Sequence, residues 1–268
     1  MGNKAESVPR SLEGYSVLVT RPEEQAGPLI AEIEKRGGQV VFAPMIVIRP
    51  RRDDPKARSL IGRLGEFHSV IFVSKNAVDV GLELMRAQHQ SLDHCQVYAV
   101  GVGTASRLRE QGIAQVHTPH GEFTSEGLLK LPGLSSHQID GENVLIVRGA
   151  GGREPLAQTL AHRGAHVEYC EVYERTMPTE PLSKQLKACD VAVPDVGIIT
   201  SPEALTNLAE KIDQEGLDLL YDVPLLVVGG RTAQQVERLG FTTPPVIVDN
   251  PGDHSIVDAL ERWVVDEQ

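Results

Sequence analysis

An internal duplication constrains the fold of this chain more than any other feature. Four segments recur in the same order about 127 to 131 positions later. The matching pairs are residues 15–48 with 142–175, 69–85 with 196–212, 98–112 with 226–240, and HGEFTSEGLLKL with PGDHSIVDALERW. Because each pair repeats the same order of strand, polar turn and amphipathic helix, the chain is built from two copies of one unit.

The length agrees with two domains, since 268 residues exceed the ~100–150 residues that are typical of one domain. A tandem boundary would fall in the polar loop 132–142. A second arrangement is suggested by residues 46–55 and 171–181, which occupy equivalent places in the two copies and are extended, charged and proline-bearing. These segments could pair as an antiparallel ribbon, with the chain crossing to the second domain and back. The residues alone leave both arrangements open.

Short runs of β-branched residues alternate with helical patterns, which is typical of a doubly wound α/β fold with a parallel sheet covered on both faces. Five strands are expected in each sheet. The predicted strands are 16–20, 39–43, 69–73, 96–100, 115–118, 143–147, 166–170, 196–200, 224–228 and 246–249. Expected helix N-caps are Ser74, Thr104, Thr124, Ser201, Thr232 and Ser255. Pro22, Pro155 and Pro202 suit first turns, and Gly37 and Gly164 suit helix C-termini.

Composition excludes several classes of protein. No apolar run approaches the ~18 residues that a membrane span needs, and the polar opening segment lacks the apolar core of a secretory signal, so we expect a cytoplasmic protein. The three cysteines share no CxxC or Cys/His spacing, which predicts neither a disulfide framework nor a zinc site. The nine histidines form no recognisable pair or triad, and Trp263 is expected in the core. A formal net charge of −11 disfavours nucleic acids and acidic membranes as partners.

Small polar and basic residues follow the predicted strands of both copies. In a parallel α/β sheet, ligands bind beyond the carboxyl ends of the strands, where helix N-termini present free N–H groups. The sequence therefore predicts anion-binding turns at residues 74–77, 101–104, 149–153, 201–203 and 229–232. Basic side chains accompany these turns, namely Arg21 and Arg231 in one domain and Lys75, Arg148 and Arg153 in the other.

Each candidate residue also has a purely structural interpretation. The hydroxyl residues would serve as helix caps, and capping does not exclude contact with a ligand. Arg21 and Lys75 would be solvated, whereas Arg148 and Arg153 would pair with Glu154 or Glu171.

Seven motifs, taken together and in order, resemble the uroporphyrinogen-III synthase family over residues 14–265. They are VLVTRP, VIFVSKNAV, YAVGVGTA, VRGAGGREPL, VYERT, ITSPEAL and VVGGRTA. The resemblance implies two similar flavodoxin-like or Rossmann-like domains with five-stranded parallel sheets, joined by a two-stranded antiparallel β-ladder. It therefore favours the crossed arrangement, with a discontinuous first domain of 1–48 and 177–268, a second domain of 52–172, and linkers at 49–51 and 173–176.

The resemblance also implies a cyclising hydro-lyase of tetrapyrrole and haem biosynthesis. The substrate of this family is hydroxymethylbilane, a small molecule with eight carboxylates, which loses water and closes with its terminal D ring inverted. No redox change occurs, so no cofactor or metal is expected, and neither GxGxxG nor GxxxxGK[ST] occurs in the chain. The enzyme is expected to act as a monomer, with the turns of both domains facing a common cleft.

Site residues follow from the matched motifs. The resemblance suggests Tyr173 of VYERT as the hydrogen-bond donor to the leaving hydroxyl, although this residue could instead pack against the ladder. Thr232 is the second catalytic candidate. The expected substrate-binding residues are Arg21, Ser74, Lys75, Asn76, Gly101, Thr104, Arg148, Gly149, Arg153, Ser201, Pro202, Gly229, Gly230 and Arg231. GGRTA and SKNA depart from the family's usual turns. We therefore expect the turns that meet the substrate carboxylates to match the family more closely than the individual side chains on those turns.

Two other functions are alternatives to the enzyme. A two-lobed, non-catalytic binding protein for an anionic small molecule would bind its ligand without producing an isomer. A receiver-type regulatory module would need clustered aspartates at its strand ends, where VLVTRP and VIFVSKN place basic and hydroxyl groups instead. The enzyme is therefore the favoured prediction.

Overall fold

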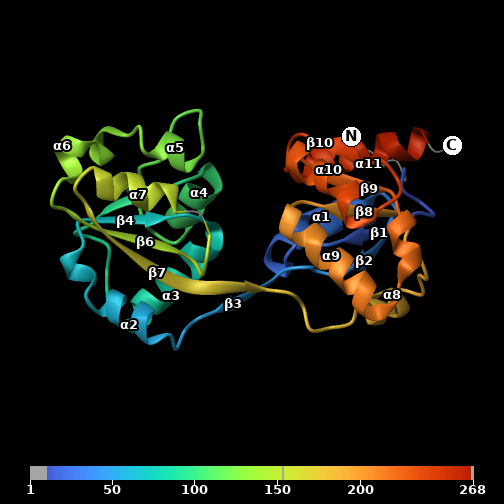
Figure 1. Cartoon of the computed structure of the whole chain (residues 1–268), viewed down its shortest axis with the longest axis horizontal. Coiled ribbons are helices and arrows are strands. Elements are labelled where there is room, and N and C mark those ends of the chain that lie inside the picture. Colours follow the sequence, from blue (N-terminus) through green and yellow to red (C-terminus); the bar gives the residue numbers. More distant parts are fainter. Residues whose placement is uncertain (1–10, 153, 267–268) are drawn as a thin grey trace, which may run out of the picture. The chain divides into compact units, whose positions relative to one another are not determined.

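The computed structural model describes residues 11–152 and 154–266. The chain divides into two compact units (Figure 1). The first unit comprises the described residues up to Val47 together with those from Thr176 onward, and the second comprises Ile48–Arg175. Each unit contains one five-stranded sheet.

The sheet of the first unit has the order β10-β9-β8-β1-β2, and its neighbouring strands are parallel. Its strands are β1 (Ser16–Val19), β2 (Gln39–Phe42), β8 (Val196–Ile199), β9 (Leu225–Val228) and β10 (Val246–Val248). Its helices are α1 (Glu23–Lys35), α8 (Leu182–Ala188), α9 (Pro202–Glu215), α10 (Gly230–Val236) and α11 (Asp253–Asp266). Helices α1 and α11 pack together over one apolar cluster, which includes Trp263 as expected. The strands are almost continuously apolar because helices cover both faces of the sheet.

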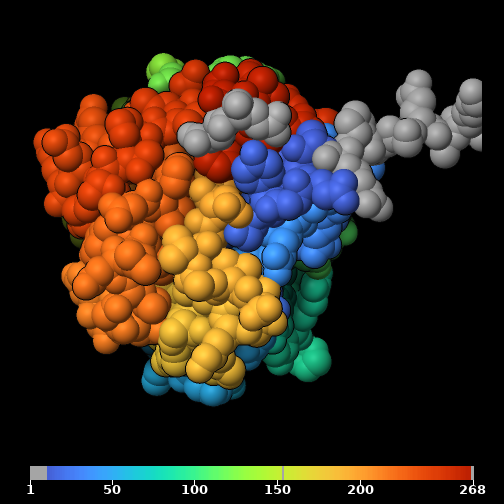
Figure 2. Space-filling view, turned by 90° about the vertical axis from the view of Figure 1, so that its right-hand side faces the viewer, coloured from blue at the N-terminus to red at the C-terminus, as the bar shows by residue number. Residues whose placement is uncertain are grey.

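The surface of this unit brings both halves of the chain together. Figure 2 shows the gold segment around α8 lying against blue N-terminal residues. The contact includes a hydrogen bond of 2.5 Å from Gln39 Nε2 to the Cys189 carbonyl. Residues on either side of the second unit in the sequence therefore build one core.

The sheet of the second unit has the order β3-β7-β6-β4-β5, in which β7, β6, β4 and β5 are parallel. Its strands are β3 (Val47–Pro50), β4 (Ser69–Phe72), β5 (Gln96–Ala99), β6 (Asn143–Gly149) and β7 (His166–Thr176). Its helices are α2 (Pro55–Gly62), α3 (Lys75–Ala87), α4 (Val102–Glu110), α5 (Ser125–Leu128), α6 (Ser136–Ile139) and α7 (Pro155–His162), besides the short 3-10 helices η1 (Leu64–Glu66) and η2 (Pro132–Leu134). Alternate strand residues enter two clusters, one against α2, α3 and α4 and the other against α5, α6 and α7.

Each sheet combines strands from both sequence copies. β1 and β2 of the first copy pair with β8, β9 and β10 of the second, whereas β6 and β7 of the second copy pair with β4 and β5 of the first. The direction of strand succession reverses between β1 and β8 in one sheet and between β6 and β4 in the other. Such a switch point is where open α/β sheets bind their ligands.

Two local expectations were wrong. Residues 115–118 form no strand but a single bridge between His117 and Tyr98, and β3 supplies the fifth strand beside β7 instead. Thr104, Thr232 and Ser255 do not cap helices, because α4, α10 and α11 begin at Val102, Gly230 and Asp253. Gly101 and Gly229 are the N-cap residues of α4 and α10, so each helix begins two residues before its threonine.

Other local expectations are confirmed. Ser74, Thr124 and Ser201 accept the N–H groups of the first turns of α3, α5 and α9. Gly37 and Gly164 follow α1 and α7 with φ of +85° and +93°, a conformation that only glycine adopts without strain. Pro155 and Pro202 begin their helices, whereas Pro22 is the N-cap of α1. Within the described residues, no helix is long and apolar enough to cross a membrane.

Candidate active site

The carboxyl edge of the second sheet gathers the turns that were predicted to bind anions. Phe72 of β4 is paired with Val147 of β6 and with Ala99 of β5, so the residues after these strands share one edge. Ser74 accepts the Ala77 N–H at 3.1 Å. Gly101 precedes α4 and has no side chain to cap it, so the first N–H groups of α4 remain available.

Lys75 and Asn76 follow Ser74 in the first turn of α3. Lys75 is exposed and Asn76 is half-buried. The Lys75 side chain crosses the start of α4, because a Cβ built on Gly103 would lie 2.8 Å from its Cε. Its positive charge is therefore held beside the uncapped N-terminus of α4. Thr104, one turn into that helix, is buried at 6% exposure.

A β-bulge at the end of β7 sets the direction of Tyr173. Arg148 is opposite Glu171, but the next residue, Gly149, is opposite Tyr173. The extra residue, Val172, shifts the alternation of side chains, so Val172 and Tyr173 both enter the cluster against α2, α3 and α4. Tyr169 packs on the other face. Without the bulge, Tyr173 would share the face of Tyr169.

Tyr173 is a buried side chain whose hydroxyl makes a polar contact at the edge of the sheet. Its exposure is 1%, and its hydroxyl lies 3.1 Å from Ser74 Oγ. A Cβ on Gly149 would lie 2.6 Å from two atoms of the ring, so only glycine fits there. The ring borders a cavity of about 240 Å³ whose lining also includes Gly149, Arg148, Tyr169 and Arg175.

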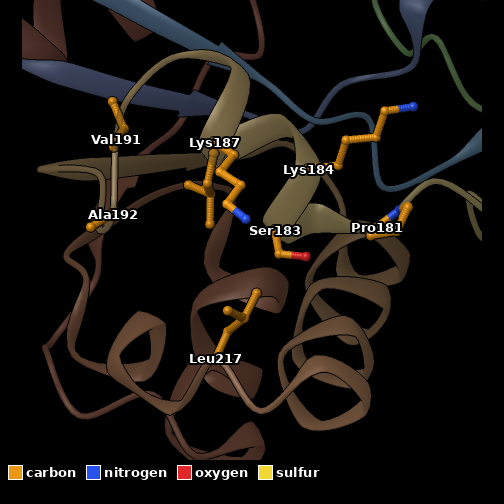
Figure 3. Close-up of a pocket in the computed structure, with 8 residues that line it drawn as sticks. Pro181, Ser183, Lys184, Lys187, Val191, Ala192 and Leu217 are labelled. Atoms are coloured by element: carbon orange, nitrogen blue, oxygen red, sulfur yellow. The ribbon is translucent and has the colours of Figure 1, made fainter.

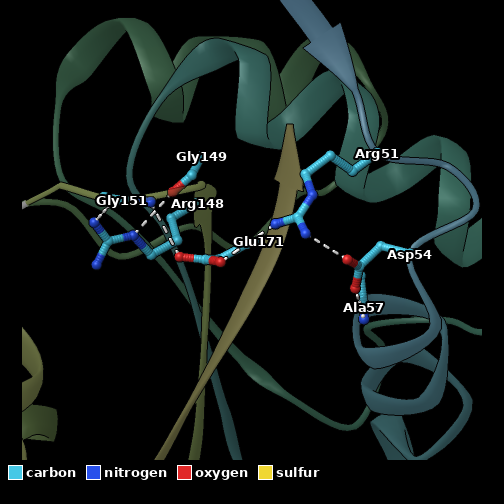
Figure 4. A network of polar contacts seen from close by, with 7 residues as sticks. All are labelled: Arg51, Asp54, Ala57, Arg148, Gly149, Gly151 and Glu171. Carbon is cyan, nitrogen blue, oxygen red and sulfur yellow. Dashed lines mark hydrogen bonds and ion pairs between the residues drawn. The ribbon is translucent and has the colours of Figure 1, made fainter. Parts of the chain in front are cut away.

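Arg148 holds the glycine turn, which we define as residues 149–152. Its guanidinium donates to the carbonyls of Gly149 and Gly151 (Figure 4), and it lies 4.7 Å from the centre of the Tyr169 ring. Burial raises the pKa of Tyr169, and the charge of Arg148 offsets part of that increase. Because Arg148 is only 7% exposed, its guanidinium mainly contacts the turn and has little contact with solvent.

Arg21 is the counterpart of Arg148 in the first unit, at the end of β1. It is also 7% exposed, and it donates to the Asp253 carboxylate and, at 2.7 Å, to the Pro251 carbonyl. The alternative interpretation of Arg21 as a solvated residue was therefore wrong. Both duplicated arginines use their guanidinium groups to hold a loop at the carboxyl edge of a sheet.

The remaining first-unit candidates surround α9 and α10. Ser201 caps α9 by accepting the Ala204 N–H at 3.2 Å, with Pro202 as the first helical residue. Gly229 has φ of +77° and precedes α10, which begins with Gly230 and Arg231. Both of these residues are exposed.

Thr232, the second catalytic candidate, is buried in the first turn of α10. Its side chain is 1% exposed, and its hydroxyl donates to the Val228 carbonyl at 2.9 Å. This hydrogen bond therefore stabilises the junction between β9 and α10.

The structure brings together Ser74 with Tyr173, and Arg148 with Gly149, whereas Arg153 lies outside the described residues. Three cavity-lining residues with polar side-chain groups were not foreseen, namely Ser125, Tyr169 and Arg175. Arg175 could have been found, because it is two positions after Tyr173 and such residues lie on the same face of a strand. Its guanidinium lies 6.0 Å from the centre of the Tyr173 ring.

Two other hollows lie away from these strand ends. One, of about 410 Å³, lies along α8 and is lined by Ser183, Lys184 and Lys187 (Figure 3). Another, of about 640 Å³, includes His68, which precedes β4, and Gln96, which begins β5. Neither is lined by a predicted site residue. Among residues 11–152 and 154–266, no group of three or more His, Cys, Asp or Glu side chains could hold a metal ion.

The fold and the strand ends define the class of protein. It is an α/β protein of two flavodoxin-like units. Each unit presents hydroxyl groups, turns that contain glycine and helix N-termini at the carboxyl ends of its strands. Such groups suit an anionic ligand.

Comparison with known proteins identifies the family. Residues 27–255 match the family model described as Uroporphyrinogen-III synthase HemD. The chain is 30% identical over 248 residues to uroporphyrinogen-III synthase of Escherichia coli (strain K12), covering 92% of this chain and 100% of the relative. It is 27% identical over 256 residues to uroporphyrinogen-III synthase of Chlorobaculum parvum, covering 92% of this chain and 99% of that relative. The chain belongs to the uroporphyrinogen-III synthase family, whose members are cyclising hydro-lyases of porphyrin biosynthesis.

Solved structures share the fold. A mutant uroporphyrinogen III synthase from the extremely thermophilic bacterium Thermus thermophilus aligns with a TM-score of 0.61 and 19% identity, covering 95% of this chain and 100% of that one. Uroporphyrinogen-III synthetase from Helicobacter pylori 26695 aligns with a TM-score of 0.60 and 17% identity, covering 93% of this chain and 99% of that one. The expected fold of two similar α/β units is therefore confirmed.

Proposed function

We propose that this chain converts hydroxymethylbilane into uroporphyrinogen III. The observation that carries the proposal is the family match, which extends over residues 27–255 and includes a relative that is 30% identical over 92% of the chain. The contact between Tyr173 and Ser74 at the switch point of the second sheet supports it locally.

The reaction removes one water from the bilane. The terminal C–O bond breaks and leaves an azafulvene, whose methylene carbon is attacked by the substituted carbon of ring D. The resulting spiro intermediate rearranges, ring D is inverted, and loss of a proton restores the aromatic pyrrole. The bilane also cyclises unaided to the type I isomer, so the protein must chiefly hold ring D in the conformation that leads to type III.

Tyr173 is the proposed donor to the departing hydroxyl. Ser74 Oγ accepts the Ala77 N–H, which leaves its proton free to donate to the Tyr173 oxygen at 3.1 Å. The Tyr173 proton is then free for the substrate, and the chain of hydrogen bonds strengthens each of its members. Ser74 thus caps α3 and orients Tyr173 at the same time.

Substrate carboxylates are proposed to bind at the two helix N-termini that follow Gly101 and Gly229. These helices have no side-chain cap, so backbone N–H groups are available to an anion. Lys75 adds positive charge beside α4. Thr232 is proposed to contribute by positioning the first turn of α10, since its hydroxyl donates to Val228.

The setting of the reaction is also a proposal. A formal net charge of −11 repels nucleic acids and acidic membranes at long range, and because it also repels an anionic substrate, local groups at the strand ends must hold that substrate. The cytoplasmic location and the monomeric state stay predictions. Size-exclusion chromatography with light scattering would test the monomer, and a mass near twice 29.2 kDa would contradict it.

A coupled assay tests the proposal. Hydroxymethylbilane is generated in situ, and the oxidised products are separated into type I and type III isomers. We expect the protein to produce type III, Tyr173→Phe to lower the rate about 100-fold, the lower end of the ~10²–10⁴-fold that general acid catalysis typically contributes, and Thr232→Ser to retain more activity than Thr232→Ala. Type I alone, from folded protein, would contradict the proposal.

A further inference from the structure

Glu171 of β7 connects two segments that meet at the candidate site (Figure 4). One carboxylate oxygen accepts the Gly151 N–H at 3.2 Å. The other contacts Arg51 Nη1 at 3.3 Å. Glu171 thus contacts the glycine turn after β6 and the segment that follows β3.

The same segments are joined through their backbones. The Ala150 N–H donates to the Tyr173 carbonyl at 2.7 Å, and the Arg51 N–H donates to the Val172 carbonyl at 2.8 Å. The bulge that directs Tyr173 begins directly after Glu171. The Glu171 carboxylate therefore makes its contacts at the point where the pairing of β7 with β6 becomes irregular.

The glycine turn needs support from outside itself. Gly151 and Gly152 have φ of +69° and +103°, and two such glycines have large conformational freedom to lose. Arg148 binds the carbonyls of Gly149 and Gly151. Glu171 binds an N–H of the same turn, so the turn is held from its donor side as well as its acceptor side.

Arg51 keeps the Glu171 carboxylate in place. Its other terminal nitrogen contacts the Asp54 carboxylate at 2.5 Å, and Asp54 also caps α2 through the Ala57 N–H at 2.8 Å. Arg51 therefore lies between two carboxylates, one of which is fixed to a helix. This arrangement limits the rotamers open to Glu171.

We infer that Glu171 is a positioning residue for the reaction, because its carboxylate ties the glycine turn to the bulge that carries Tyr173. It sets the position of the Tyr173 hydroxyl relative to the backbone of the turn. The inference rests on the proposed function for its effect on catalysis. Its effect on the turn itself does not depend on that function.

Three variants separate this role from a general effect on stability. Glu171→Ala removes the contact, and Glu171→Gln retains an oxygen that can accept the Gly151 N–H. Glu168→Ala is the matched control, since Glu168 is on the same strand, is 41% exposed against 36% for Glu171, and pairs with Arg63 at 3.1 Å.

We expect kcat of Glu171→Ala to fall about tenfold, the scale of one charge-assisted hydrogen bond, with KM changed less and with a smaller fraction of type III product. Glu171→Gln should recover most of the rate. Glu168→Ala should match the wild type, and all three variants should unfold at similar temperatures. Equal kcat and isomer fractions for Glu171→Ala and Glu168→Ala would overturn the inference.

Amide hydrogen exchange gives a readout that is independent of activity. The Gly151 amide should exchange faster in Glu171→Ala than in the wild type or in Glu168→Ala. Unchanged exchange would overturn the inference even if the protein is the synthase. Faster exchange in a protein that forms no type III isomer would reject the proposed function and retain the anchoring of the turn.

Discussion

Replacing Gly149 with alanine would force a methyl group against the ring of Tyr173. The new Cβ would lie 2.6 Å from Cε2 and Cζ of the ring, whereas ordinary contact begins at 3.4 Å, so the ring must retreat by about 0.8 Å. Tyr173 is 1% exposed, and a close-packed core resists such a shift. Overpacking of this kind costs about 1–3 kcal/mol.

The displaced ring would also lose its contact with Ser74, now 3.1 Å long, for about 1 kcal/mol more. We therefore expect Gly149→Ala to lower the free energy of unfolding by about 2–4 kcal/mol. Because the Tyr173 hydroxyl moves, the rate of type III formation should fall more than about tenfold. Urea unfolding and the coupled isomer assay measure the two effects.

Gly65→Ala is the control for this substitution. Gly65 lies in η1 of the same unit, is exposed, and has nothing within 4 Å of a built Cβ. Its unfolding free energy should stay within about 0.5 kcal/mol of the wild type. If Gly149→Ala is as stable and as active as Gly65→Ala, the ring does not lie against Gly149 and the description of the site is wrong.

Three further predictions concern the contact between Tyr173 and Ser74, a partly buried ion pair and acid sensitivity. In a double-mutant cycle, Tyr173→Phe and Ser74→Ala should show a coupling of about 0.5–1.5 kcal/mol in unfolding free energy, and additive effects would exclude their hydrogen bond. Arg21→Ala, which removes a side chain that is 9% exposed, should lower the free energy of unfolding by about 2 kcal/mol. Lys184→Ala at an exposed pair should lower it by at most about 0.5 kcal/mol, and equal losses would contradict the greater contribution expected of the less exposed pair. Burial alone would raise the pKa of Glu215, but hydrogen bonds from the start of α8 outweigh it and lower that pKa. Its contribution to stability is therefore present above pH ~4.3 and lost as pH falls through the folded pKa, so urea unfolding of Glu215→Gln should depend less on pH between about 5 and 3 than the wild type does.

Local patterns in the sequence were sufficient to predict much of the fold. A strand followed by a hydroxyl residue and an amphipathic helix depends on neighbouring residues alone, so Ser74 and Ser201 were recognised as caps and are confirmed. The repetition of that pattern indicated two similar sheets. The glycines after α1 and α7 were equally visible, because their conformation is a local requirement.

The direction of side chains at the site could not be predicted in the same way. An unbroken alternation along β7 would place Tyr173 with Tyr169, and the bulge that separates them arises only when β6 and β7 pair. Arg21 and Arg148 were identified at strand ends, but their burial depends on loops that return from distant positions in the chain or fold back over the edge. Thr232 was mistaken for a cap because the glycine before α10 starts that helix earlier.

The central claim is tested most directly by the isomer composition of the product as the protein is titrated against freshly generated hydroxymethylbilane. The fraction of type III should rise with protein concentration until it replaces the type I isomer that forms unaided. A product that stays type I at every concentration of folded protein would contradict the proposed synthase activity and favour a protein that binds an anionic ligand without catalysis.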